Sequence, residues 1–249
     1  MGRKLLAFDV GNSRIKIALF DDGELILRES VALSNLGDCE QILAERFELD
    51  GAPDNTLIAS VVRGAGESIC AAVQSVWAIT PRVIDTQMDL GIDFAVARPD
   101  HVGIDRLLEA SEAFQIVQGA VVVAAFGSAI TVDLVSSEGV FQGGTIAPGL
   151  QLGSKALHVE TSLLPQVELE PPASAIGTDT VACILSGIVY GAAGAVDRLF
   201  DEFVAGGEAT LVLTGGDAAL MSDYIQKPHR IEEDLVLRAL VSQDQRECT

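Results

Sequence analysis

The sequence predicts a mixed α/β protein made of two related domains. Apolar runs of strand length alternate along the chain with segments whose apolar residues have helical spacing. A strand, a glycine turn and a second strand recur later in the chain in the same order. The 249 residues are enough for two small domains, each with its own core. We therefore expect an N-terminal domain at residues 1–117 and a C-terminal domain at 118–249.

The expected elements begin with three strands. Residues 5–8 are continuously apolar, as in a strand that is buried on both faces. A glycine turn precedes a second strand at 15–19, and the Asp-Asp-Gly sequence predicts a hairpin into a third strand at 24–29. A helix, a strand, a helix and a long Gly/Ala-rich helix are expected further on, at residues 39–49, 56–62, 68–78 and 181–200. The long helix would suit a subunit interface and an internal core equally well.

An internal repeat relates the two halves of the chain. The segments that match are residues 5–25 and 121–141. In this overlay Gly11 falls on Gly127, the hairpin glycines coincide, and the apolar strands are expected to be in phase. Ala125 occupies the position of Asp9. The second glycine turn therefore lacks the acidic residue that precedes the first.

The charge of the chain limits its partners. The formal net charge is −20, with 16 Lys and Arg against 36 Asp and Glu. Such a chain repels phosphate backbones at long range, so nucleic acid and anionic membranes are not expected as partners. Any phosphate would have to be held by local backbone donors.

Cysteine spacing and hydropathy predict a soluble cytoplasmic protein. The four cysteines are far apart and form no C-x-x-C pair, so neither a zinc site nor a disulfide framework is indicated. We expect no apolar stretch that approaches the ~20 residues that span a bilayer.

The first glycine turn has the residues of a phosphate and magnesium site. Asp9 follows a buried strand, where a carboxylate would hold Mg²⁺ or its water. Gly11 lets the backbone approach an anion, and Asn12, Ser13 and Lys16 could donate to phosphate oxygens. The alternative is a hairpin in which the Asp and Asn side chains simply cap the turn.

Two further glycine turns follow strands in the same way. Gly127-Ser128-Ala129 comes after one apolar strand. Gly215 and Gly216 come after another, and open into a helix suited to contacts with adenosine or a phosphate. Each turn alone could be structural. Three strand-then-glycine elements in a fixed order favour nucleotide binding.

An ordered set of motifs resembles one family. The set is D-x-G-N-[ST]-x-x-K, V-G-x-D-R, G-[ST]-A-x-T-x-D, G-G-x-I-x-P-G and T-G-G, over residues 9–216. In this order it resembles the type III pantothenate kinases of the actin, Hsp70 and sugar-kinase superfamily. The resemblance implies two ribonuclease-H-like (actin-like ATPase) domains, with mixed sheets flanked by helices and a cleft between them. It also implies phosphoryl transfer from Mg-ATP to the 4′-hydroxyl of pantothenate, the first step of coenzyme A biosynthesis, by a homodimer.

The resemblance also implies roles for the segment Gly103-Ile104-Asp105-Arg106. This segment matches the pantothenate-binding motif, in which the Asp is the general base. A carboxylate suits this role, since it can take the proton of the attacking hydroxyl. Arg106 could bind the pantothenate carboxylate. The structural alternative is an Asp at a helix start beside a surface Arg.

Two other segments match substrate-binding motifs of the family. Residues 143–149, with Gly144, match a substrate-side loop in which glycines permit close approach. Residues 177–180 match the segment that gives Thr180 a substrate-binding role, although Asp179 departs from the usual residue. Thr178 and Asp179 would also serve as helix N-caps. The three histidines match no motif and receive no role.

Ala125 is the main departure from the family pattern. The resemblance implies an Asp at this position as ligand of a monovalent cation, K⁺ or NH₄⁺. A methyl group cannot coordinate a cation, so the site should be lost, weakened or rebuilt from a residue such as Asp133. Three hypotheses follow: an enzyme active without the cation, a degenerate regulatory protein that binds nucleotide or pantothenate, or a kinase for another small alcohol.

Overall fold

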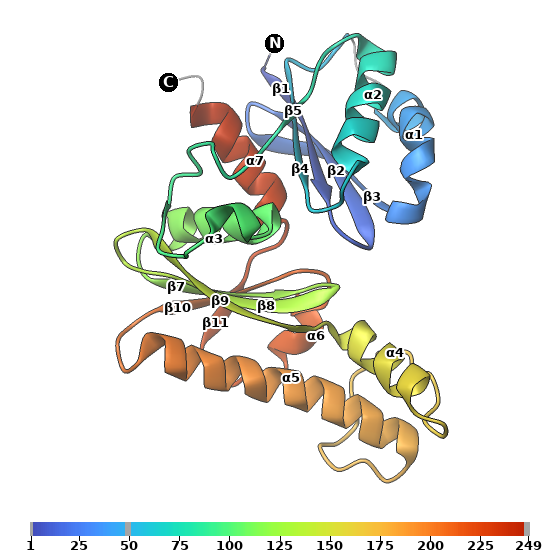
Figure 1. Cartoon of the computed structure of the whole chain (residues 1–249), viewed down its shortest axis with the longest axis vertical. Coiled ribbons are helices and arrows are strands. Elements are labelled where there is room, and N and C mark those ends of the chain that lie inside the picture. Colours follow the sequence, from blue (N-terminus) through green and yellow to red (C-terminus); the bar gives the residue numbers. More distant parts are fainter. Residues whose placement is uncertain (1, 48–50, 247–249) are drawn as a thin grey trace. The chain divides into compact units, whose positions relative to one another are not determined.

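The structure is a computed structural model that describes residues 2–47 and 51–246 (Figure 1). The chain divides into two compact units. Unit 1 comprises Met1–Gly91, Ala97–Glu112 and Leu235–Thr249, and unit 2 comprises Ile92–Val96 and Ala113–Asp234. Each unit is therefore discontinuous, whereas two continuous domains, 1–117 and 118–249, were expected. Cys248 lies outside the described residues.

Unit 1 contains a five-stranded mixed sheet. Its strands are β1 (Lys4–Val10), β2 (Arg14–Asp21), β3 (Glu24–Ala32), β4 (Asn55–Ser60) and β5 (Arg82–Val83), in the order β3-β2-β1-β4-β5. The first three strands form antiparallel hairpins, and β1, β4 and β5 are parallel. Strand β3 extends beyond the expected end at residue 29.

Unit 1 also contains several helices. They are η1 (Leu33–Asp38), α1 (Cys39–Arg46), α2 (Ala65–Trp77), η2 (Pro99–His101), the start of α3 (Ile104–Val117) and α7 (Leu235–Arg246). Phe8 and Ile17 pack with Leu43 and Ile69 in one core cluster, because alternate strand residues face the helices α1 and α2. Helix α7 packs against β1 and β4 (Figure 1).

Unit 2 contains a six-stranded mixed sheet. Its strands are β6 (Asp93–Phe94), β7 (Val121–Phe126), β8 (Ala129–Val135), β9 (Val140–Pro148), β10 (Thr210–Thr214) and β11 (His229–Ile231), in the order β11-β10-β7-β8-β9-β6. The hairpins β7-β8 and β8-β9 are antiparallel, and β7, β10 and β11 are parallel. The predicted mixed α/β class is confirmed.

The two sheets share one topology. In both, a strand forms two successive hairpins on one side and pairs in parallel on the other, as β3-β2-β1-β4-β5 and β9-β8-β7-β10-β11. The expected phase of the repeat is wrong after the turn, however. Val10 pairs with Ile15, whereas Phe126 pairs with Ile130, because the second turn is one residue shorter. Lys16 therefore corresponds to Thr131.

Helix α5 (Thr180–Val204) accompanies the sheet of unit 2, with α4 (Leu150–Glu160) and the short α6 (Ala218–Ser222). Val189, Ala193 and Val196 of α5 pack in the core against β7, β8 and β10. By length and composition α5 could also cross a membrane, and a third of its most apolar window is buried. The expectation that no apolar stretch reaches that length is therefore wrong. Its contacts with the sheet account for the apolar character of its buried face.

Candidate functional site

The first glycine turn of unit 1 places an acidic side chain opposite a basic one. Asp9 and Lys16 are cross-strand partners on β1 and β2, and their Oδ2 and Nζ atoms are 3.7 Å apart. The Gly11 amide donates to the Arg14 carbonyl at 3.0 Å and closes the turn. Asn12 and Ser13 are exposed at its tip. The turn therefore presents one carboxylate, one ammonium group and polar tip residues together.

The segment of Asp105 is linked to the same end of β1. The Val61 amide donates to the Val10 carbonyl at 3.1 Å, so the chain after β4 runs beside the end of β1. A Cβ atom at Gly103 would lie 3.6 Å from the Val61 side chain and 2.4 Å from Asp105 Oδ1. A side chain at position 103 would therefore displace the carboxylate. The segments around Asp9 and Asp105, which are distant in the sequence, are connected in unit 1 through Val61.

Asp105 has a perturbed environment. It lies in the first turn of α3, and its Oδ1 accepts a hydrogen bond of 2.8 Å from the Arg106 amide. Burial raises the pKa of Asp105, while that hydrogen bond and the charge of Arg106 oppose the rise. A carboxylate with a raised pKa is a stronger proton acceptor once it is ionised. The site thus offers a candidate general base.

Three glycine segments of unit 2 converge at the end of β7. A Cβ at Gly215 would lie 2.3 Å from the Phe126 carbonyl oxygen, and one at Gly149 would lie 2.2 Å from the Gly127 carbonyl oxygen. The Gly149 amide donates a hydrogen bond of 3.2 Å to the backbone carbonyl of Ser128. Only glycine permits these backbone approaches, and Gly215 also has a φ of +93°. Tertiary contacts therefore bring together the turns 127–128 and 215–216.

This convergence leaves backbone accessible. Gly127, Ser128 and Gly216 are exposed. Exposed turns without bulky side chains can donate amide hydrogen bonds to phosphate oxygens. The Gly127 amide donates within its own turn, to the Ala129 carbonyl at 3.0 Å, so the exposed positions 128 and 216 are the candidates for contact with a nucleotide phosphate.

Ala125 is surrounded by neutral partners. It is buried, and its cross-strand neighbours are Thr131 on β8 and Thr214 on β10. Asp133 lies opposite Val123, two pairs further from the turn. Among the described residues, no group of three His, Cys, Asp or Glu side chains could hold a metal ion. Ala125 and its cross-strand neighbours therefore do not fit a cation that requires a carboxylate at position 125.

Gly144 lies in a strand and not in a loop. The expected substrate-side loop 143–149 is largely part of β9, where Gly144 pairs with Asp133. A Cβ at Gly144 would lie 2.0 Å from the Val132 carbonyl oxygen and 2.4 Å from Asp133 Oδ1. Close packing between β8 and β9 therefore explains this glycine without a ligand.

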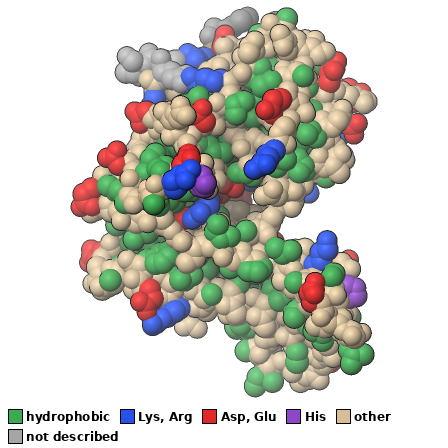
Figure 2. Space-filling view, in the orientation of Figure 1, with side chains coloured by type: hydrophobic (Ala, Val, Ile, Leu, Met, Phe, Trp, Pro, Cys, Tyr) green, Lys and Arg blue, Asp and Glu red, His purple; other side chains and the backbone are tan. Residues whose placement is uncertain are grey.

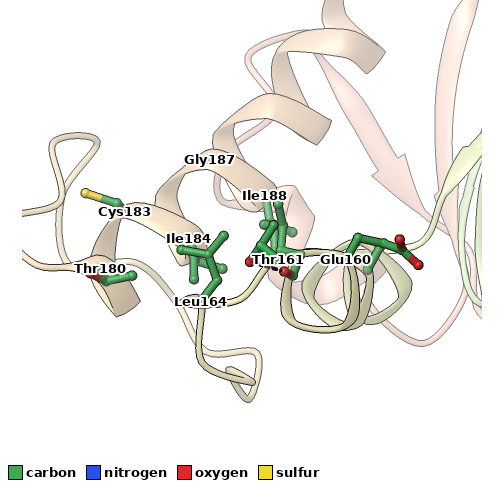
Figure 3. A pocket seen from close by; sticks show the side chains of 11 residues that line it. Glu160, Thr161, Leu164, Thr180, Cys183, Ile184, Gly187 and Ile188 are labelled. Atoms are coloured by element: carbon green, nitrogen blue, oxygen red, sulfur yellow. Dashed lines mark hydrogen bonds between the residues drawn. The ribbon is translucent and has the colours of Figure 1, made fainter.

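Thr180 lines an apolar cavity in unit 2 (Figure 3). The cavity of about 700 Å³ lies between α4 and α5, and its lining includes Leu157, Cys183 and Ile184. Asp179 caps α5 by accepting a hydrogen bond of 2.9 Å from the Ala182 amide, as its residue type predicted. The lining of this cavity contains none of the residues of the turns 127–128 and 215–216. The structure therefore separates Thr180 from those turns.

One candidate site residue was not identified from the sequence. Asp217 follows Gly215 and Gly216, and burial raises its pKa. Its amide donates to the Phe126 carbonyl at 3.2 Å, which places it where the glycine turns meet. The T-G-G motif ends just before it, and the sequence offered no sign that its carboxylate is partly buried.

Comparisons with known proteins identify the family and the fold. The sequence profile of the family described as type III pantothenate kinase matches residues 5–202. A type III pantothenate kinase of Rhodospirillum rubrum is 34% identical over 95% of this chain and 96% of its own length. One from Finegoldia magna is 33% identical over 88% of each chain. The crystal structure of an inorganic polyphosphate/ATP-glucomannokinase from Arthrobacter has a TM-score of 0.53 at 14% identity, over 98% of this chain and 99% of that one, so the two share a fold.

Proposed function

Because the chain belongs to the type III pantothenate kinase family, we propose that it transfers the γ-phosphoryl group of ATP to the 4′-hydroxyl of pantothenate. The products are ADP and 4′-phosphopantothenate, and the reaction opens coenzyme A biosynthesis. The observation that carries the proposal is the link in unit 1, through Val61, between the Asp9 turn and the Asp105 segment.

Asp105 is the general base of the proposed reaction. Its ionised carboxylate accepts the proton of the 4′-hydroxyl as the oxygen attacks the γ-phosphorus. The hydrogen bond from the Arg106 amide to Oδ1 fixes the carboxylate and leaves Oδ2 for the substrate. The Arg106 guanidinium binds the pantothenate carboxylate, because its planar fork matches two carboxylate oxygens.

Asp9 and Lys16 act on the phosphate side. The Asp9 side chain is 15% exposed and offers the hard oxygen ligand that Mg²⁺ prefers, so it would hold the ion or one of its waters. Mg²⁺ bound with ATP would neutralise charge on the phosphates. Lys16 contacts phosphate oxygens, and the glycine turns 127–128 and 215–216 bind the nucleotide through their backbone. Asn12 and Ser13 donate at the tip of the first turn.

The proposed reaction does not use a monovalent cation at position 125. The first turn pairs Asp9 with Lys16, and the second pairs Ala125 with Thr131. Both members of the charged pair are thus replaced by neutral side chains. The proton acceptor, the magnesium-side carboxylate and the phosphate-side ammonium group all remain in unit 1, which supports an active enzyme that has lost this ion.

A cytoplasmic homodimer is part of the proposal. Leu152 and Val159 of α4, with Leu163, Ile176 and Val181, expose large apolar side chains. Figure 2 shows hydrophobic side chains on the surface of this part of unit 2. A second copy would cover them, and the glycines of α5 would allow close helix packing. The net charge of −20 supports small-molecule substrates and not nucleic acid or anionic membranes.

One assay tests the proposed function. Purified protein is given Mg-ATP with and without pantothenate, and ADP release and 4′-phosphopantothenate are measured by a coupled assay and mass spectrometry. We expect pantothenate-dependent release of ADP without added K⁺ or NH₄⁺. Absence of product at every concentration of these cations would refute the kinase function. A rise of the melting temperature with ATP in that same sample would favour a regulatory nucleotide-binding protein.

A further inference from the structure

Asp217 stands where the glycine turns of unit 2 meet. It follows Gly215 and Gly216, and its amide is bonded to the Phe126 carbonyl at the end of β7. The contact between Gly215 and the Phe126 backbone fixes the turn from the other side. Position 217 is therefore held by two strands, β7 and β10, and not by the short helix α6 alone.

The carboxylate of Asp217 makes no hydrogen bond or ion pair with the described residues. Asp217 occupies the N-cap of α6, yet its side chain makes no capping hydrogen bond. Asp179 caps α5 from an extended backbone with ψ of 173°, whereas Asp217 has ψ of 6°, which does not present the side chain to the helix amides. The side chain is half-buried, and burial raises its pKa without a partner that opposes the rise.

The chemistry of this carboxylate selects its ligand. A carboxylate repels phosphate oxygens and accepts hydrogen bonds from neutral hydroxyl groups. On a nucleotide whose phosphates lie at the glycine turns 127–128 and 215–216, the nearest hydroxyl donors belong to the ribose. Acidic residues bind ribose hydroxyls in the same way in dinucleotide-binding folds.

We propose that Asp217 binds the ribose hydroxyls of the nucleotide and thereby selects ribonucleotides over deoxyribonucleotides. This inference rests on the nucleotide site of the proposed function and adds a specificity residue to it. When 2′-deoxyATP binds, the hydrogen bond from the missing hydroxyl is lost, and the half-buried carboxylate of Asp217 is left without a donor. For the wild-type enzyme we expect kcat/KM to be about tenfold higher with ATP than with whichever of 2′-deoxyATP and 3′-deoxyATP is the poorer substrate.

The test compares Asp217→Ala and Asp217→Asn with wild type on ATP, 2′-deoxyATP and 3′-deoxyATP. In Asp217→Ala, kcat/KM for ATP should fall about tenfold, to the value that wild type has with the poorer deoxynucleotide. The kcat/KM of Asp217→Ala for that deoxynucleotide should differ less than about twofold from the wild-type value. Asp217→Asn keeps an acceptor oxygen and should retain part of the preference. The matched control is Asp223→Ala, which removes an exposed carboxylate at the other end of α6 and should preserve the full preference.

A binding measurement separates this inference from the proposed function. ADP and 2′-deoxyADP are titrated calorimetrically into wild type and Asp217→Ala, without pantothenate. Loss of the ADP preference in Asp217→Ala would support the ribose contact even in a protein that does not phosphorylate pantothenate. Equal use of ATP and both deoxynucleotides by an active wild-type enzyme would overturn the inference and leave the kinase function standing. A preference that survives in Asp217→Ala would overturn it as well.

Discussion

At the scale of single residues, burial of Asp105 links catalysis to stability. Its pKa is raised in the folded protein, so the protonated form is favoured relative to the unfolded chain. The stabilisation is fully present below the unfolded pKa and is lost as pH rises through the folded pKa. At neutral pH the ionised carboxylate therefore costs free energy, and the proposed role of Asp105 as a base requires this ionised form.

Asp105→Asn should lower kcat by about 10²–10⁴-fold and raise the melting temperature at pH 7. The amide oxygen of Asn can still accept the hydrogen bond of the Arg106 amide, so the turn should be kept. The gain in melting temperature should shrink as pH is lowered through the folded pKa of Asp105. The acid limb of the wild-type kcat/KM profile should lie above the ordinary range of Asp.

Asp100→Asn is the matched control for this prediction. The hydrogen bond from Arg98 lowers the pKa of the exposed Asp100, so removal of that charge should not stabilise the protein at pH 7. A stabilisation of the same size in both variants would point to a general effect of the net charge of −20. Full activity of Asp105→Asn would contradict its role as base.

A second prediction at this scale concerns Ala125. Ala125→Asp places a carboxylate in a buried position between Thr131 and Thr214. Without a cation this should destabilise the protein by about 1–3 kcal/mol, because the charge is desolvated. KCl should recover part of the loss, whereas choline chloride at equal ionic strength should not. Thermal unfolding of wild type, Ala125→Asp and Ala125→Asn in both salts measures this.

The neutral Ala125→Asn variant separates the charge from the added volume. A melting temperature of wild type that itself rises with K⁺ more than with choline would contradict the loss of the cation site. A K⁺ response in Ala125→Asn as large as in Ala125→Asp would show that the carboxylate is not the ligand.

At the scale of elements, the turn after β10 contains two adjacent glycines with different constraints. Gly215 has a φ of +93° and backbone atoms of Phe126 where a Cβ would lie, whereas Gly216 has open space. Gly215→Ala should destabilise the protein by about 2–4 kcal/mol through backbone strain and overpacking. Gly216→Ala should leave stability within about 0.5 kcal/mol. Urea unfolding of the two variants measures the difference.

The functional effects of the two substitutions should also differ. A methyl group at the exposed position 216 should raise KM for ATP without loss of stability, because it narrows the backbone approach to the nucleotide. Equal destabilisation by the two variants would mean that the contact between the turns of β7 and β10 does not hold the fold.

At the scale of the whole molecule, helix α7 completes unit 1 from the far end of the chain. Leu235, Leu237 and Leu240 are buried, and Asp244 accepts hydrogen bonds from Arg3 at 2.8 Å and Asn55 at 2.7 Å. A fragment of residues 1–117 therefore lacks one layer over β1 and β4. We expect this fragment to lack cooperative thermal unfolding.

The same fragment joined through a flexible linker to residues 234–249 should recover a cooperative transition, since the linker costs little loop entropy. Circular dichroism at increasing temperature compares the two. A fragment 1–117 that unfolds cooperatively by itself would favour continuous domains over the discontinuous unit 1.

The strand and turn pattern was largely predictable from the sequence, but its register was not. Apolar runs predicted β1, β2 and the glycine turn between them, because strand burial leaves a local signature. The one-residue difference between the turns before Ile15 and Ile130 left no such signature, so the expected phase was wrong. The expected loop around Gly144 is a strand. Glycine is typical of turns, but in β9 it allows close packing against β8.

The sequence by itself determined the fold class, the ordered motifs and the net charge, because these depend on residue type and local spacing. Only the tertiary structure decided which distant segments meet: Asp9 with Asp105 through Val61, and the turns of Gly127 and Gly215 with each other. It also decided that the side chain of Asp217 is half-buried and does not cap α6. These features depend on contacts between residues far apart in the chain, and the packing that stabilises them leaves no local pattern.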